Sequence, residues 1–344
     1  MKKNAIANNS NNDLFIKIII ASFSFLLYSQ TIKFDFTLDD ETVYVQNTLV
    51  QDGLKNIDKI FTSPSIGEQS QLTSNKPYRP LTILVFAIEH SLFNNNTAAL
   101  HFFNVLMYML VILILYNTLI KLFSNYSNIL IALIVMLYAA HPVHSEVVAN
   151  IKAMDEILAA LFGFSAWYYF LKAFETNDSN SKNIILYSIL SLLAILSKES
   201  GIVFCALLPL SLLLIKKVEF KKVFLFSTPF LGVALIFYLL RQNAVGSQVS
   251  NPPLPLLDNV LYIANTFGEK VATRLLTLYL NFKTLVIPYP LTCDYTYQYV
   301  YVANFNDYKV LLSIIIYTSL LFFGIYNWKK NTTISFSILL IDFY

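Results

Sequence analysis

The chain has 344 residues, of which 56% are hydrophobic and only 13% are charged. Soluble domains carry roughly 25% charged residues, so this composition excludes an ordinary soluble protein and indicates an integral membrane protein in contact with the lipid bilayer. The formal net charge of +3 is too small to predict nucleic-acid binding.

Residues 14–28 form the first apolar segment, after a basic and Asn-rich start at residues 1–13. No small-residue cleavage pattern follows, and many further apolar segments do, so we expect a retained signal anchor in place of a cleaved signal peptide. Lys2 and Lys3 predict that residues 1–13 are cytoplasmic, by the positive-inside rule. The loop after the anchor then faces the periplasm of a bacterial inner membrane or the lumen of the endoplasmic reticulum.

The first outer loop is predicted at residues 31–98 and carries the acidic cluster Asp39, Asp40 and Glu41 among aromatic residues. Neighbouring carboxylates repel one another, which tends to raise at least one pKa, and a raised pKa suits a general base. We therefore predict that these three residues are catalytic. The alternative is a solvated acidic loop without a chemical role. Later in the loop, residues 81–93 are too few to cross about 30 Å of hydrocarbon and are expected at the interface.

The remaining apolar segments predict an all-α polytopic bundle of about 8–10 transmembrane helices. The lysines support this interpretation because they fall at alternate ends of the segments, on the side of the N-terminus. The predicted spans are 99–120, 127–141, 156–173, 183–197, 201–215, 222–240 and 309–328, with a further segment from residue 332. The lysines concerned are Lys121, Lys172, Lys182, Lys216, Lys217, Lys221, Lys222, Lys329 and Lys330.

A late outer loop is predicted at residues 241–308. Its apolar part, residues 271–287, is interrupted by Arg274 and Lys283. A charge at a helix centre costs roughly 2.5–3.5 kcal/mol on insertion scales, so a simple span is disfavoured. We expect a re-entrant or interfacial helix pair in this loop.

Three basic residues at the predicted outer face are candidates for binding a donor phosphate. Lys198, which Glu199 is predicted to support, opposes the positive-inside trend, and charged residues at membrane depth usually pair or mark a ligand path. Arg79 and Arg274 lie beside apolar runs, and a guanidinium group matches phosphate oxygens in a bidentate manner. The alternatives are a Lys198–Glu199 ion pair, snorkelling, and anchoring of the arginines to lipid headgroups.

Two imidazoles and a carboxylate occur together in His141-Pro142-Val143-His144-Ser145-Glu146, where a span reaches the outer face. This spacing could hold a metal ion, but Pro142 disturbs a regular helical pair and no third strong ligand is placed. No metal ligand is therefore assigned, and a divalent cation stays an open alternative. We predict a helix-capping turn in which His141 and His144 hydrogen-bond a phosphate or the acidic loop and Glu146 supports them.

Asp155 and Glu156 begin the predicted span at residues 156–173. Carboxylates in the first turn of a helix interact favourably with its dipole. We therefore predict that this pair caps the helix.

Several short motifs occur in a fixed order and together resemble a known family. They are Asp39-Asp40, Tyr78-Arg79-Pro80-Leu81-Thr82, the His141–Glu146 segment, Ser197-Lys198-Glu199-Ser200-Gly201, Thr273-Arg274-Leu275-Leu276-Thr277, and Pro288 through Asp294-Tyr295. Over residues 30–330 the chain resembles the transmembrane and tetratricopeptide-repeat-containing O-mannosyltransferases and their bacterial relatives, within the GT-C superfamily.

The resemblance implies a GT-C-like transmembrane domain at residues 14–344 that transfers mannose from a polyprenyl-phosphate-linked sugar to Ser or Thr of secreted or membrane proteins. Asp39 matches the position of the superfamily's catalytic acid. The family's C-terminal repeats have no counterpart here, because no period near 34 residues appears. Two other interpretations stay open: a transporter or flippase of a lipid-linked anionic substrate, and an inactive relative that serves as a scaffold.

Overall fold

The computed structural model describes residues 2–37, 39–66, 76–175, 181–246, 260–291 and 299–343. Every regular element in these ranges is a helix, which confirms the all-α prediction. The chain divides into two units. The first consists of Met1–Ser70 and Lys76–Gln248, and the second of Gln71–Asn75 and Val249–Tyr344.

Five helices in the described ranges are long and apolar enough to cross a membrane. They are α1 (Lys2–Tyr28), α5 (Thr97–Leu122), α8 (Met154–Glu175), α11 (Phe220–Val245) and α13 (Tyr308–Asn327). Shorter apolar helices accompany them: α4 (Pro80–Phe93), α6 (Asn128–Ala139), α9 (Ser181–Ser197), α10 (Val203–Leu214) and α14 (Thr332–Phe343). Each of the two units thus combines helices of spanning length with shorter apolar helices.

The connections of the first unit contain short helical turns that hold some of the charged residues discussed below, among them Glu41, Lys152 and Glu199. They are η1 (Ser29–Lys33), η2 (Glu41–Val45), α2 (Thr48–Gln51), η3 (Gly53–Asn56), α3 (Ile57–Thr62), α7 (His144–Ala149), η5 (Ile151–Ala153) and η6 (Glu199–Ile202). Polar residues set the helix starts beside them. The side chain of Asn96 accepts a hydrogen bond from the N–H of Ala99 at the start of α5, and Pro80 occupies the first turn of α4.

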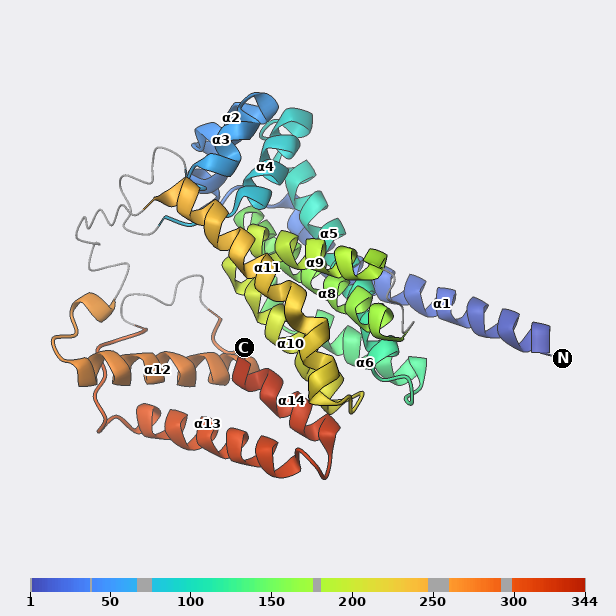
Figure 1. Ribbon diagram of the computed structural model, residues 1–344. Coiled ribbons are helices and arrows are strands. Elements are labelled where there is room, and N and C mark those ends of the chain that lie inside the picture. The colour runs from blue at the N-terminus through green and yellow to red at the C-terminus, as the bar shows by residue number, and fades with distance from the viewer. Residues whose placement is uncertain are drawn as a thin grey trace. The chain divides into compact units, whose positions relative to one another are not determined.

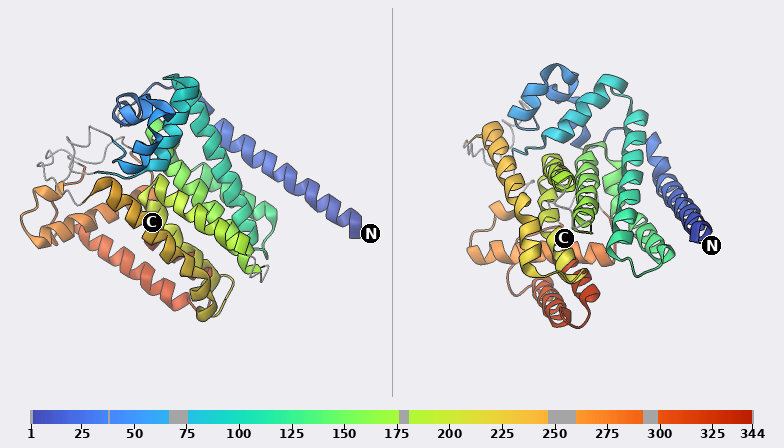
Figure 2. Two further views of the ribbon diagram at one scale, coloured as in Figure 1. Left: turned by 45° about the horizontal axis from the view of Figure 1, so that its top comes forward. Right: turned by 45° about the vertical axis from the view of Figure 1, so that its right-hand side comes forward.

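The centre of the first unit is α8, which packs against both α5 and α9 (Figures 1 and 2). Phe170 of α8, Tyr187 of α9 and Phe230 of α11 form an aromatic cluster with ring centroids 5.2–5.7 Å apart. Nearby, Nε1 of the buried Trp167 donates to Oγ of Ser211 at 3.0 Å, so its polar atom is satisfied. This packing fixes the C-terminal half of α8 against α9, α10 and α11.

Charged side chains gather at both ends of α8. At the C-terminal end, Glu175 pairs with Lys121 and, at 3.9 Å, with Lys216, two of the lysines predicted to share one side of the membrane. At the N-terminal end lies Asp155. The two carboxylates are separated by 20 residues of helix, or about 30 Å, which matches the hydrocarbon thickness of a bilayer.

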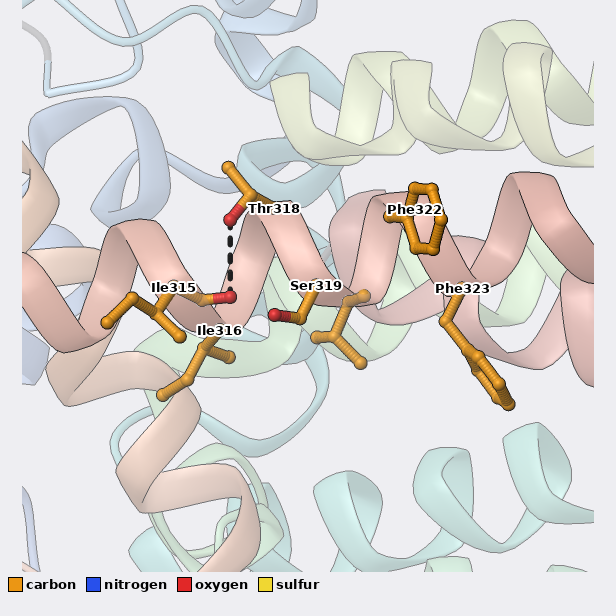
Figure 3. Close-up of a pocket in the computed structure, with 7 residues that line it drawn as sticks. Ile315, Ile316, Thr318, Ser319, Phe322 and Phe323 are labelled. Carbon is orange, nitrogen blue, oxygen red and sulfur yellow. Dashed lines mark hydrogen bonds between the residues drawn. The ribbon is translucent and has the colours of Figure 1, made fainter.

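The second unit contains α12 (Phe267–Val286), α13 and α14. The hydroxyl of Tyr317 donates to the carbonyl of Leu278 at 3.2 Å and thereby joins α13 to α12. A hollow of about 690 Å³ runs along α13, lined by Ile315, Ile316, Thr318, Ser319, Leu320, Phe322 and Phe323 (Figure 3). None of these lining side chains is charged.

Candidate active site

The first part of the site is the carboxylate of Asp40, which is completely buried. Its Oδ1 accepts a hydrogen bond from the backbone N–H of Lys152 at 2.7 Å, and its Oδ2 accepts one from the N–H of Thr37 at 3.0 Å. Burial raises the pKa of Asp40, although these two hydrogen bonds oppose the shift. The sequence predicted a raised pKa in this cluster, but from repulsion between carboxylates; the structure assigns the shift to burial.

Asp39 differs from its neighbour because 65% of its side chain is exposed. Its Oδ2 lies 3.3 Å from Nζ of Lys152, so the residue whose backbone holds Asp40 also pairs with Asp39 through its side chain. Glu41 is exposed and accepts a hydrogen bond from Gln46 at 3.1 Å. The cluster thus contains one anchored carboxylate and two accessible ones.

The second part of the site is an ion-pair cluster around Asp155, whose side chain is only 3% exposed. Nη1 of Arg79 donates to Asp155 at 2.6 Å, and Nε of Arg79 donates to Glu199 at 2.9 Å. Burial alone would lower the pKa of the Arg79 guanidinium, but the carboxylates of Asp155 and Glu199 raise it overall. Arg79 and Glu199, assigned separately from sequence, are therefore in direct contact.

Lys198 joins the same cluster from the end of α9. Its Nζ lies 2.6 Å from Oε1 of Glu156 and 3.5 Å from Oδ1 of Asp155. The sequence left an ion pair between Lys198 and Glu199 as an alternative. The structure pairs Lys198 with Glu156 and Glu199 with Arg79 instead. The capping prediction for Asp155 was incomplete: Oδ1 does accept the N–H of Glu156 at 2.7 Å, but the side chain also binds two cations.

A glycine brings Lys198 and Glu199 to this position. A Cβ atom on Gly201 would lie 2.6 Å from the backbone carbonyl of Ala194, so only glycine allows η6 to turn this tightly against α9. The hydroxyl of Thr82 donates to the carbonyl of Ser197 at 2.9 Å and fixes the same turn to α4. The Ser197–Gly201 motif therefore has a structural basis in addition to its charges.

Both parts of the site meet on residues 150–156. Lys152 contacts Asp39 and Asp40, and Asp155, three residues further, binds Arg79 and Lys198. Sequence reasoning missed Lys152 and gave Asp155 only a capping role. One sequence feature could have indicated the role of Asp155. The acidic pair Asp155-Glu156 lies at the membrane boundary on the same predicted side as Lys198, a cation that the positive-inside rule does not explain.

His141 and His144 lie beside aromatic side chains. Nδ1 of His144 is 3.1 Å from the hydroxyl of Tyr108, and its ring is 4.5 Å from that of Tyr138. Burial, with a smaller effect of His141, lowers the pKa of His144 to about 4, so it is neutral near pH 7. Among the described residues no group of three His, Cys, Asp or Glu side chains forms a metal site.

Two further predicted residues lie outside these contacts. Glu146 is exposed on α7. Arg274 is exposed on α12, in the second unit. Asp294 and Tyr295, which contributed to the resemblance, lie outside the described residues. The roles given to Glu146 and Arg274 stay predictions.

Residues 75–243 match the family model described as dolichyl-phosphate-mannose-protein mannosyltransferase. The protein O-mannosyl-transferase F38B6.6 of Caenorhabditis elegans is 30% identical over 188 residues, which are 54% of this chain and 26% of that protein. Human TMTC1 is 30% identical over 194 residues (54% and 22%), and human TMTC4 is 28% identical over 207 residues (54% and 27%). No solved structure matches the chain.

The helical architecture and the apolar spans define a polytopic all-α membrane protein with a charged site at one end of its central helix. Over about half of its length the chain is similar to the protein O-mannosyltransferases. It spans about a quarter of the length of the curated relatives that it matches.

Proposed function

We propose that this chain is a membrane glycosyltransferase that moves a mannose-like sugar from a polyprenyl-phosphate donor to Ser or Thr hydroxyls of secreted or membrane proteins on the outer face. The observation that carries the proposal is the meeting of an accessible carboxylate, Asp39, and a pair of cations, Arg79 and Lys198, on residues 150–156. A base and a phosphate-binding group are the two functions that this transfer requires. The relatives, which are named as protein O-mannosyltransferases, agree with it.

In the proposed reaction Asp39 is the general base. It accepts the proton of the acceptor hydroxyl while the acceptor oxygen forms a bond to the anomeric carbon of the sugar. The bond from that carbon to the phosphate oxygen breaks, and its electron pair leaves with the phosphate, which gains one negative charge. Arg79 and Lys198 stabilise this charge. A single displacement of this kind inverts the anomeric configuration.

Asp40 and Lys152 have supporting roles in this proposal. Asp40 is buried and accepts two backbone hydrogen bonds, so it fixes the loop that presents Asp39. Lys152 orients the side chain of Asp39 through a contact of 3.3 Å. Glu41 is an accessible neighbour whose carboxylate could replace Asp39 only in part.

The test uses the full chain and a labelled polyprenyl-phosphate mannose donor. Asp39→Asn is expected to abolish transfer while membrane insertion stays intact, and Asp58→Asn, which removes an exposed carboxylate from the same outer loop, is the matched control. Full transfer activity in both Asp39→Asn and Asp40→Asn would remove the assignment. Movement of the intact lipid-linked sugar across vesicles without transfer would support the transporter instead.

A further inference from the structure

The ion-pair cluster contains more negative than positive formal charges. Two cations, Arg79 and Lys198, face three carboxylates, those of Asp155, Glu156 and Glu199. The cations are therefore already compensated. An added phosphate would increase the excess of negative charge, which a partly buried site disfavours.

The three carboxylates differ in their access to water. The side chain of Asp155 is 3% exposed, whereas those of Glu156 and Glu199 are 42% and 36% exposed. Either glutamate can rotate into solvent at a lower cost than Asp155, because partly exposed ion pairs are weaker than buried ones. Asp155 cannot leave in this way, and it contacts both cations.

The glutamate oxygens occupy positions that phosphate oxygens would use. Oε2 of Glu199 is 2.9 Å from Nε of Arg79, and its Oε1 accepts the backbone N–H of Tyr78 at 3.2 Å. Oε1 of Glu156 is 2.6 Å from Nζ of Lys198. If both glutamates moved away, Nε of Arg79, the backbone N–H of Tyr78 and Nζ of Lys198 would each lose an acceptor, and donors of these kinds bind phosphate.

We propose that Glu156 and Glu199 occupy the donor's phosphate site when it is empty and that the phosphate of the lipid-linked donor binds Arg79 and Lys198 by displacing them. Asp155 stays in place as the positioning residue that holds the two cations together. This inference rests on the proposed function, because it concerns the donor phosphate of that reaction. The resulting exchange keeps the cations paired both before and after binding.

The experiment measures the Kd of the full chain in detergent for polyprenyl phosphate without sugar, and separately the donor KM and kcat of transfer. Glu199→Gln and Glu156→Gln are each expected to tighten binding and lower the donor KM, by roughly two- to five-fold, with kcat little changed. Asp155→Asn is expected to weaken binding by roughly ten-fold or more, because the cations lose their buried anchor. Asp58→Asn should leave Kd unchanged.

Weaker binding in both Glu199→Gln and Glu156→Gln, or no binding of polyprenyl phosphate by any form of the chain, would overturn the exchange. The glutamate variants keep the test valid even if Asp155→Asn does not fold, which size-exclusion chromatography reports. Failure of the proposed function has a different signature: the expected order of Kd values is retained, but no form of the chain transfers sugar.

Discussion

The backbone N–H of Lys152 donates a hydrogen bond of 2.7 Å to Oδ1 of Asp40, although the two residues are 112 positions apart in the chain. The contact joins the loop after the first span to the start of α8. Because Asp40 is fully buried, the position of its exposed neighbour Asp39 depends on this bond. The acidic cluster is therefore held by residues that do not belong to it.

Asp40→Asn is expected to destabilise the protein by about 1–3 kcal/mol, because asparagine offers one acceptor oxygen where two backbone N–H groups now donate. Asp39→Asn should change stability little, since its side chain is mostly exposed. Thermal unfolding in detergent compares the two variants. Equal melting temperatures would contradict the anchoring role of Asp40.

Arg79→Lys is expected to raise the donor KM and to lower stability by about 1–3 kcal/mol. A single ammonium group cannot reproduce the two directed bonds of the guanidinium to Asp155 and Glu199. The loss should be smaller than for a fully buried pair because Arg79 is 24% exposed. Arg241→Lys, near the end of α11, is the matched control, and it should leave both quantities near wild type.

Gly201→Ala is expected to destabilise the protein by about 1–3 kcal/mol and to raise the donor KM, because the new Cβ would meet the Ala194 backbone at 2.6 Å. Gly232→Ala in α11 is the control. A Cβ atom there meets nothing within 4 Å, so alanine should be neutral or stabilising by up to about 1 kcal/mol. Similar melting temperatures for the two variants would exclude the close approach of η6 to α9.

His144 predicts a loss of stability between pH 7 and pH 5. Its pKa is about 4 in the folded protein and 6.5, the ordinary value, in the unfolded chain. Between these two pH values the unfolded chain binds more protons, so the stability of the fold rises with pH. The expected loss at pH 5 is about 1–2 kcal/mol. Denaturant unfolding at both pH values measures it. In His144→Gln the difference between the two pH values should shrink by this amount; an unchanged difference would exclude the buried neutral imidazole.

The amino-acid sequence by itself determined the helical class, the membrane setting and the presence of charged residues where apolar runs end. These properties follow from composition and local periodicity, which need no knowledge of distant contacts. It also identified Asp39, Asp40, Arg79, Lys198 and Glu199 as candidates, because each is a charge that local packing does not require.

Only the tertiary structure decided how these residues are paired. The separation of Asp40 as an anchor from Asp39 as an accessible carboxylate depends on burial, and adjacent residues of the same type carry no sequence signal for it. The same holds for Asp155, whose contacts with Arg79 and Lys198 join segments 76 and 43 residues apart. Ion pairs between distant segments follow from helix packing in three dimensions, and one-dimensional spacing does not encode them.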